Sequence, residues 1–179
     1  GPTVNGSPHL GHAKTFIQFD FIVKYLRYRG YDVFYLQNIT DIDDKIIKKG
    51  AEEKSSWTEI ASRYEKEYMQ MMKALNVDAV TEYAKATDHI QEIISQVKRL
   101  IEKDYAYETS DGIYYDVSKF KDYGKLSGRT ELEEEDSVSR IDESIDKRNW
   151  QDFCLWKYSK PGEPVWEADI GDGRPGWHI

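Results

Sequence analysis

The clearest pattern in the chain is a helical one near its beginning. Apolar residues recur there at helical spacing, with charged residues between them: Phe16, Phe19, Val23 and Leu26. This spacing predicts an amphipathic helix from about Leu10 to Arg29. The turn-forming run 5–8 precedes it, and Gly30 is a natural end.

Later segments show alternating strand-like and helix-like patterns. Residues 31–39 are typical of a short buried strand, which follows the first helix as in a parallel α/β unit. Helical periodicity returns between Trp57 and Met71 and again between Ile90 and Ile101. Residues 105–117 predict a hairpin that turns at Ser110-Asp111-Gly112. The order of these elements predicts an α/β fold.

Composition narrows the possible functions. The 179 residues carry a net charge of −8, which argues against a broad nucleic-acid-binding face and leaves room only for local RNA contacts. No apolar run is long enough to span a membrane. The single cysteine, Cys154, stands among apolar residues and is expected to be a small buried residue. One thiol forms no internal disulfide, which fits a reducing cytosol.

Two histidines, His9 and His12, flank Gly11 at the start of the first predicted helix. Free backbone N–H groups and the positive end of the helix dipole gather there, so an anion such as a triphosphate is favoured. Two imidazoles could add hydrogen-bond donors, and Gly11 would let a flat base approach the backbone. The alternative is that these histidines only cap the helix or pack on the surface.

Longer motifs give these residues a context. The chain contains Gly1-Pro-Thr-Val4, His9-Leu-Gly-His12, the ten-residue run 38–47 (NITDIDDKII), Asp146-Lys-Arg-Asn149, Asp152-Phe-Cys-Leu-Trp-Lys157 and Gly173-Arg-Pro-Gly-Trp-His178. In this order and spacing they resemble the catalytic domain of the cysteinyl-tRNA synthetases, which are class I aminoacyl-tRNA synthetases. His9-Leu-Gly-His12 is similar to their HIGH motif, and the resemblance covers nearly the whole chain.

The resemblance implies a Rossmann-like (HUP-type) nucleotide-binding fold with a parallel sheet, interrupted by a connective α+β insertion. Residues 1–75 would be the first part of the catalytic domain, 76–165 mostly the insertion, and 166–179 a return to the catalytic core. The implied activity is ATP- and Mg²⁺-dependent conversion of cysteine to cysteinyl-adenylate and its transfer to tRNA(Cys), a step of protein biosynthesis in the cytoplasm. No membrane or DNA partner is expected.

The resemblance also implies roles for individual residues. His9, Leu10, Gly11 and His12 would bind ATP, with His9 and His12 stabilising charge as the cysteine carboxylate attacks the α-phosphate. Four further residues would line the cysteine pocket: Gly1, Thr3, Thr40 and Trp177. For Trp177, a core position after the Pro-Gly turn is the alternative.

The same resemblance places the zinc ligands of the family outside this chain. A cysteine ligand would stand directly before Gly1, another two positions after Ile179, and His and Glu ligands further on; the KMSK loop would also follow. The chain is therefore expected to be a catalytic-domain segment truncated at both ends, without zinc and inactive alone. Lys157-Tyr-Ser-Lys160 resembles KMSK but stands too early in the chain.

Two other functions stay open. The cysteine ligase of mycothiol synthesis shares the HIGH motif and zinc pocket but passes cysteine to an amino sugar; Lys45, where that enzyme tends to have proline, favours the synthetase. The chain could also be a catalytically inert nucleotide-binding module.

For three groups of residues a binding function can be considered, but a structural role explains the presence of these residues more simply. The acidic residues Asp41, Asp43 and Asp44 suggest magnesium, but the first helical positions favour aspartate through capping and the dipole. The run Glu131–Ser137 is expected to be a solvated loop rather than a metal site. The hairpin tyrosines could stack on RNA, but strand packing explains them better: Tyr105, Tyr107, Tyr114 and Tyr115.

Overall fold

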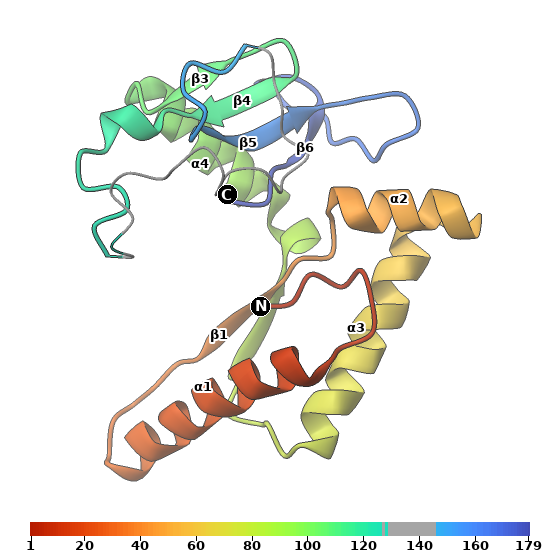
Figure 1. Ribbon diagram of the computed structural model, residues 1–179, viewed down its shortest axis with the longest axis vertical. Coiled ribbons are helices and arrows are strands. Elements are labelled where there is room, and N and C mark those ends of the chain that lie inside the picture. Colours follow the sequence, from red (N-terminus) through yellow and green to blue (C-terminus); the bar gives the residue numbers. More distant parts are fainter. Residues whose placement is uncertain (127, 129–145) are drawn as a thin grey trace. The chain divides into compact units, whose positions relative to one another are not determined.

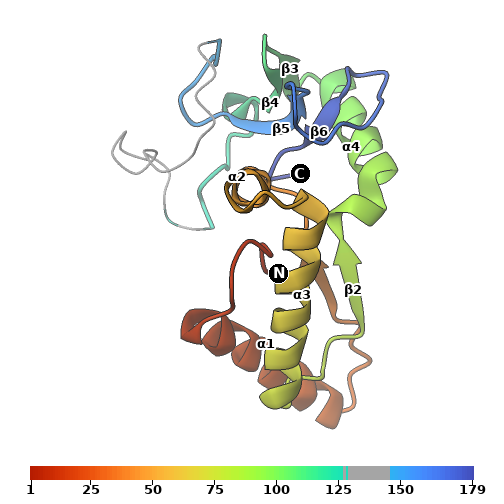
Figure 2. The same cartoon turned by 90° about the vertical axis from the view of Figure 1, so that its right-hand side faces the viewer.

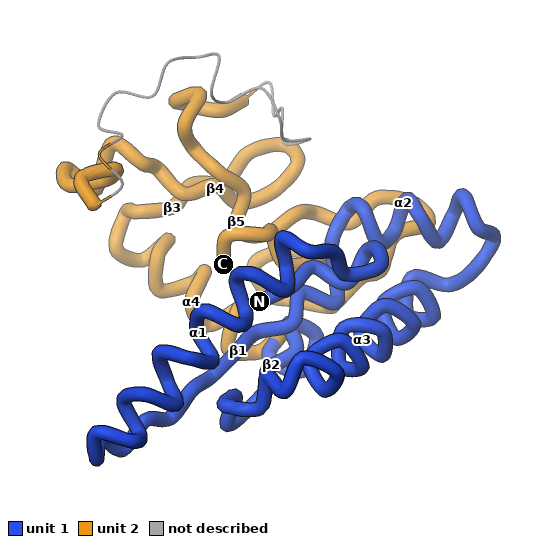
Figure 3. The backbone as a smooth tube through the Cα atoms, turned by 60° about the horizontal axis from the view of Figure 1, so that its bottom comes forward, with its two compact units in different colours: residues 1–89 blue, residues 90–179 orange. Residues whose placement is uncertain are grey.

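The computed structural model describes residues 1–126, 128 and 146–179 (Figure 1). These residues form two compact units, Gly1–His89 and Ile90–Ile179, which are coloured separately in Figure 3. Each unit has its own sheet and core. The acidic run Glu131–Ser137 lies outside the described residues.

The first unit is built from helices around a parallel strand pair. Its elements are α1 (Leu10–Tyr28), β1 (Leu36–Ile39), α2 (Asp44–Glu53), α3 (Trp57–Ala74), β2 (Glu82–Lys85) and the short 3₁₀ helix η1 (Ala86–His89). Strands β1 and β2 pair in parallel, with Leu36 opposite Glu82 and Ile39 opposite Lys85. A parallel pair joined by helices is the architecture of an α/β fold, as the sequence predicted.

Helix α3 is central to the core of this unit. Its residues Ile60 and Tyr64 belong to a buried cluster with Ile39 of β1, and Tyr68 meets the ring of Phe16 from α1 edge-on, with centroids 5.2 Å apart. Figure 2 shows α3 running beside β2, to which it is also tied by an ion pair between Glu65 and Lys85 at 2.8 Å. The periodic burial along α3 explains why the sequence predicted this helix.

Helix α1 matches the predicted span, but its buried face differs from the predicted one. Phe19 is 51% exposed, whereas Asp20 is only 7% exposed. The reason is that the Asp20 carboxylate accepts hydrogen bonds from the backbone N–H groups of Asp78 (2.9 Å) and Ala79 (2.8 Å). A buried acid is tolerated where such donors satisfy it.

The predicted strand over residues 31–39 is also shorter than expected. Only Leu36–Ile39 form β1, and burial alternates along it because one face packs on the core and the other is exposed. Its partner β2 was not predicted, because its residues (EYAK) lack a strand-like apolar pattern.

The second unit packs one helix on an antiparallel sheet. It contains α4 (Ile90–Glu102), β3 (Ala106–Glu108), β4 (Gly112–Tyr115), the 3₁₀ turn η2 (Val117–Lys119), β5 (Phe153–Tyr158) and β6 (Gly173–Pro175). The strand order is β3-β4-β5-β6, and the apolar side of α4 covers one face of the sheet around the fully buried Trp156.

Three predictions for this unit are confirmed. Residues 105–117 contain the β3–β4 hairpin. Tyr107 and Tyr114 are 7% and 1% exposed, so strand packing accounts for them, and Cys154 is a buried apolar residue at 1% exposure.

In the part of the chain that the structure describes, no helix is both long enough and apolar enough to cross a bilayer.

Candidate functional site

The histidine pair forms the beginning of α1. His9 is the N-cap residue, and its Nδ1 accepts a hydrogen bond from the Gly11 backbone N–H at 3.1 Å. The Nδ1 of His12 accepts from the His9 backbone N–H at 3.2 Å, which closes a reciprocal capping box. The two imidazoles lie against each other with ring centroids 4.0 Å apart. Both histidines therefore do cap the helix, as the simpler interpretation held.

Because capping uses only Nδ1, the second ring nitrogen of each histidine, Nε2, is available for another interaction. Because Nδ1 accepts in both rings, the single proton of each neutral imidazole is carried by Nε2. The two Nε2–H groups are therefore donors at the positive end of a 19-residue helix. Capping and anion binding are compatible here, since they use different atoms of the same side chains.

The protonation state of His12 supports this arrangement. Burial, and secondarily repulsion from His9 when that ring is protonated, lower the pKa of His12 below its usual value of 6.5. His12 is therefore neutral at physiological pH and keeps its Nδ1 lone pair for the cap. A neutral His12 stabilises added negative charge through a directed hydrogen bond rather than through net positive charge.

Gly11 leaves room for the His9 ring in its observed position. A Cβ atom at residue 11 would lie 2.9 Å from Cε1 and 3.0 Å from Nδ1 of His9. Leu10, the other residue of the motif, is 86% exposed and contributes no core packing. The glycine thus lets the His9 imidazole fold over the first turn of the helix.

The start of the chain lies beside the end of β1, where three of the four predicted cysteine-pocket residues meet. Thr3 and Thr40 form a parallel bridge, with Val4 N–H donating to the Thr40 carbonyl oxygen at 3.1 Å and Thr40 N–H to that of Pro2 at 2.9 Å. A Cβ at Gly1 would lie 1.5 Å from the Asn38 carbonyl oxygen, so only glycine fits there. The carboxyl end of a parallel strand is where open α/β sheets usually bind ligands.

A lysine from α2 supports the loop that joins these two parts. The Lys49 ammonium donates to the Asn5 carbonyl oxygen at 3.2 Å and lies 4.3 Å from the centre of the Tyr64 ring. It thereby links the loop before His9 to the core of the first unit. Neither Lys49 nor Asn38, whose side-chain oxygen is 2.7 Å from the Gly1 nitrogen, was identified from the sequence. No local pattern could have found them, because their partners are distant in the sequence.

The aspartates after β1 have structural partners. Asp43 is the N-cap of α2 and accepts from the Lys45 N–H at 2.9 Å, and Asp44 lies in the first turn, as the capping interpretation predicted. Asp41 is different: it is 6% exposed and accepts from the N–H and hydroxyl of Thr87, at 3.1 and 2.5 Å. Among the described residues, no three His, Cys, Asp or Glu side chains are placed to hold a metal ion.

Trp177, the fourth predicted pocket residue, belongs to the second unit. It is 50% exposed, and its ring meets that of His178 edge-on with centroids 4.8 Å apart.

The sequence of the chain matches a known protein family over its whole length. The family model described as "tRNA synthetases class I (C) catalytic domain" matches residues 1–179. The chain belongs to this family of class I tRNA synthetases. Its parallel strand pair, with a histidine-capped helix leading into it, is consistent with the Rossmann-like fold predicted for such a domain.

Three relatives with similar sequences are all named cysteine–tRNA ligase. The chain is 55% identical to a cysteine–tRNA ligase of Thermoplasma acidophilum, 52% identical to one of Thermococcus gammatolerans and 51% identical to one of Pyrococcus horikoshii. Each match covers 100% of this chain but only 39%, 37% and 37% of the respective relative. The chain therefore spans less than two fifths of the length of these class I synthetases.

Proposed function

We propose that this chain is part of a cysteine–tRNA ligase that converts cysteine and ATP to cysteinyl-adenylate and transfers cysteine to tRNA(Cys). The observation that carries the proposal is the histidine pair at the start of α1, with both Nε2–H groups left as donors by the capping box. Identity of 50% or more to proteins named cysteine–tRNA ligase supports the choice of substrate.

In this proposal the triphosphate of ATP lies at the N-terminus of α1. The free N–H groups of the first turn and the two imidazole donors stabilise the charge that develops as the cysteine carboxylate oxygen bonds to the α-phosphorus and pyrophosphate leaves. Leu10 and Gly11, both exposed, flank the ATP. Gly1, Thr3 and Thr40 would hold the cysteine in reach of the phosphate, with Trp177 as a wall of the pocket.

In this proposal, neither metal ion is held by the described residues of this chain. Mg²⁺ would accompany ATP, and Zn²⁺ would bind the cysteine thiolate in the full-length enzyme. The described residues do not fit either ion, because Asp41 and Asp43 are already hydrogen-bonded and Cys154 is buried.

We further propose that residues 76–165 are mostly a connective insertion between catalytic parts 1–75 and 166–179, that the parent works in the cytoplasm, and that this segment alone is inactive. Strands β3, β4 and β5 of the antiparallel sheet lie within residues 76–165, which supports the insertion, whereas β6 of the same sheet lies in 166–179 and β2 of the parallel pair lies in 76–165. The single buried cysteine fits a reducing compartment.

The test is transfer of labelled cysteine by the full-length protein with ATP, Mg²⁺ and Zn²⁺, offered tRNA(Cys) or an amino sugar as acceptor. We expect label in the tRNA alone. Label in the amino sugar would favour the mycothiol-type ligase instead. ATP binding by folded protein without turnover of cysteine would show a nucleotide-binding module and contradict the proposal.

A further inference from the structure

Asp41 is a buried acid of the first unit that neither caps a helix nor takes part in the proposed function. It directly follows Thr40, just past the carboxyl end of β1, and is only 6% exposed. The cap of α2 is a different residue, Asp43. A carboxylate in the protein interior is costly unless hydrogen bonds satisfy it, so the contacts of Asp41 indicate what it does.

Both carboxylate oxygens of Asp41 accept hydrogen bonds from one residue, Thr87. Oδ1 accepts from the Thr87 backbone N–H at 3.1 Å, and Oδ2 accepts from the Thr87 hydroxyl at 2.5 Å. Two hydrogen bonds to one partner fix the orientation of the carboxylate as well as its position. This pair, the Asp41–Thr87 clamp, joins residues that are 46 positions apart in the sequence.

The clamp continues the pairing of the two parallel strands by means of side chains. Strands β1 and β2 lie side by side (Figure 1), and their last paired residues are Ile39 and Lys85. Asp41 and Thr87 each stand two positions further along, and Thr87 belongs to η1, which begins directly after β2. The clamp therefore ties together the two segments that leave the sheet at the edge where open α/β sheets usually bind ligands.

Thr40 is held on both sides as a result. On one side, backbone hydrogen bonds of 3.1 and 2.9 Å join it to the start of the chain, where Thr3 is its bridge partner. On the other side, the clamp fixes the next residue to η1. The Thr40 hydroxyl meets the Asn38 amide nitrogen at 3.4 Å, a long contact, so its position depends mainly on the backbone.

A lysine of β2 connects the clamp to the core of the unit. The Lys85 ammonium forms an ion pair with Glu65 of α3 at 2.8 Å. Hydrogen bonding to Glu65, with a smaller contribution from the charge of Asp41, raises the pKa of Lys85. The charge of Asp88 also acts on Lys85, but from an exposed position outside the clamp. Asp88 therefore offers a comparison that carries the same charge as Asp41.

We propose that Asp41 is a positioning residue for cysteine activation: its clamp on Thr87 holds Thr40 where Thr40 contacts the cysteine substrate. This inference rests on the proposed function. Asp41 acts through Thr40 and does not itself touch the substrate. Moving a substrate-binding group by about 1 Å can cost about 100-fold in rate, so a residue that only positions another has a measurable effect. A purely structural role would change the free energy of unfolding and leave substrate binding by folded protein unaltered.

The experiment measures the KM for cysteine and the KM for ATP in ATP–pyrophosphate exchange by the full-length protein. Thr87→Val keeps the shape and the backbone N–H of Thr87 but removes its hydroxyl, whereas Thr87→Ser keeps the hydroxyl. Asp41→Asn keeps the shape of the side chain and removes its charge. Urea unfolding of each variant separates a change in stability from a change in substrate binding.

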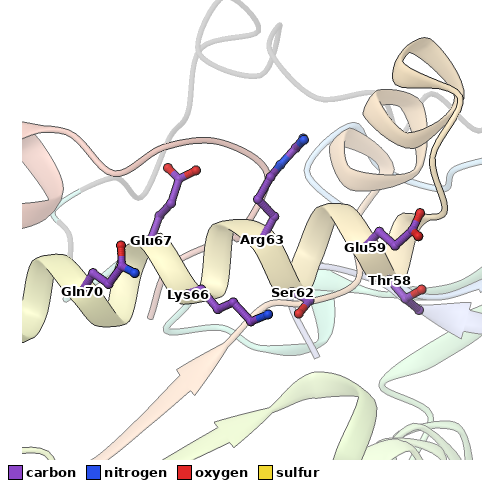
Figure 4. A pocket seen from close by; sticks show the side chains of 7 residues that line it. All are labelled: Thr58, Glu59, Ser62, Arg63, Lys66, Glu67 and Gln70. Carbon is purple, nitrogen blue, oxygen red and sulfur yellow. The ribbon is translucent and has the colours of Figure 1, made fainter.

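Two control variants make the same chemical changes away from the clamp. Thr58→Val alters an exposed threonine of α3, which Figure 4 shows among the polar side chains around a pocket of about 500 Å³. The Thr58 hydroxyl lies 2.9 Å from that of Ser56. Asp88→Asn removes a negative charge directly beside Thr87 and keeps both hydrogen bonds of the clamp. Both controls should change either KM by less than about 2-fold, as is usual for surface substitutions.

We expect Thr87→Val and Asp41→Asn to raise the KM for cysteine by about 10-fold. The KM for ATP should change by less than about 2-fold, because ATP lies at the start of α1 in the proposed function. Thr87→Ser should behave like the wild type. In a Thr40→Val background, which lacks the hydroxyl that the clamp positions, Thr87→Val should raise the KM for cysteine by less than about 2-fold.

An unchanged KM for cysteine in folded Thr87→Val and Asp41→Asn, or equal increases in both KM values, would overturn the inference. The full effect of Thr87→Val in the Thr40→Val background would overturn it as well, because the clamp would then act through another residue. Should Thr87→Val not fold, Asp41→Asn against Asp88→Asn decides in the same way.

The wild type separates this inference from the proposed function. If the wild type activates cysteine and the clamp variants keep its KM for cysteine, only the inference fails. If the folded wild type shows no cysteine-dependent exchange, the proposed function fails and the inference fails with it.

Discussion

His9 and His12 each use the ring nitrogen Nδ1 to accept a backbone hydrogen bond at the start of α1. Nδ1 of His9 accepts the Gly11 N–H, and Nδ1 of His12 accepts the His9 N–H. This reciprocal use of Nδ1 leaves both Nε2–H groups as donors at the start of α1. The local architecture of the helix thereby prepares a site for an anion, with no need for either histidine to be charged.

The capping role predicts a difference between two substitutions at the same position. His9→Ala removes the acceptor for the Gly11 N–H and should cost about 1 kcal/mol of local helix stability, whereas His9→Asn supplies a good cap and should cost little. Amide hydrogen exchange in the full-length protein measures this. The Gly11 amide should exchange about 5-fold faster in the alanine variant than in the asparagine variant. Equal rates in the two variants would show that the His9 side chain is not the cap.

Gly11→Ala should disturb the site although alanine is the better helix former. Its Cβ would lie 2.9 Å from Cε1 of His9, so the imidazole must move away from the cap. Ordinarily the change would stabilise a helix by about 1 kcal/mol. Here we expect no gain in stability and a clear loss of ATP affinity, measured by equilibrium dialysis.

The matched control for this substitution is Gly6→Ala. A Cβ at residue 6 would meet no atom within 4 Å. ATP affinity should therefore be unchanged. Weakened binding in both variants would mean that the loop, rather than the His9 ring, is sensitive to a methyl group.

Acidification should destabilise the first unit through His12. Burial lowers the pKa of His12 in the folded state below 6.5, so the unfolded chain takes up this proton at a higher pH than the folded one does. The contribution to stability is therefore full above about pH 6.5 and is lost as the pH falls towards the folded pKa. Denaturant unfolding of the wild type and of His12→Asn between pH 8 and pH 5 should show a smaller decrease for the variant. Identical pH dependence would exclude His12 as the cause.

Asp152 should be sensitive to substitution, because it is a buried acid with several hydrogen-bond donors around it. It is 1% exposed and accepts from Val117, Asn149 and the Tyr107 hydroxyl, whose pKa burial raises to about 12. Asp152→Ala leaves these donors unsatisfied and should cost about 3 kcal/mol. In hydrogen exchange, the Val117 and Asn149 amides should lose about 100-fold protection.

The control for Asp152 is the exposed Asp169, which pairs with Lys98 on the surface. Asp169→Ala should leave exchange at Val117 and Asn149 unchanged, because a surface ion pair contributes little. If both variants lost the same protection, the effect could not be assigned to the buried hydrogen bonds.

Local periodicity predicted the parts of this fold that depend on nearby residues. The helices α1, α3 and α4 and the β3–β4 hairpin all follow from spacing of apolar residues and from turn residues. Strand β2 could not be found in this way, because its polar residues become a strand only by pairing with β1. The burial of Asp20 depends on backbone groups 58 and 59 residues away.

The residues of the candidate site also fall into those that a local sequence pattern could identify and those that depend on distant partners. His9 and His12 were identified because their motif and their place at a helix start are visible in the sequence. Lys49 was not, since it donates its hydrogen bond to Asn5, which is 44 positions away in the sequence. Of the four hairpin tyrosines that the sequence singled out, Tyr107 and Tyr114 are buried, as strand packing predicted.

The most direct test of the central claim is cysteine-dependent ATP–pyrophosphate exchange by the full-length protein, compared with His9→Asn. Asparagine keeps the cap but lacks the Nε2–H donor, so folding should be preserved while exchange falls by about 100- to 1,000-fold, as for loss of one transition-state donor. Wild-type exchange that depends on cysteine, together with this loss, is the predicted result. Exchange that His9→Asn leaves intact, or folded wild type that shows no exchange with cysteine, would contradict the account.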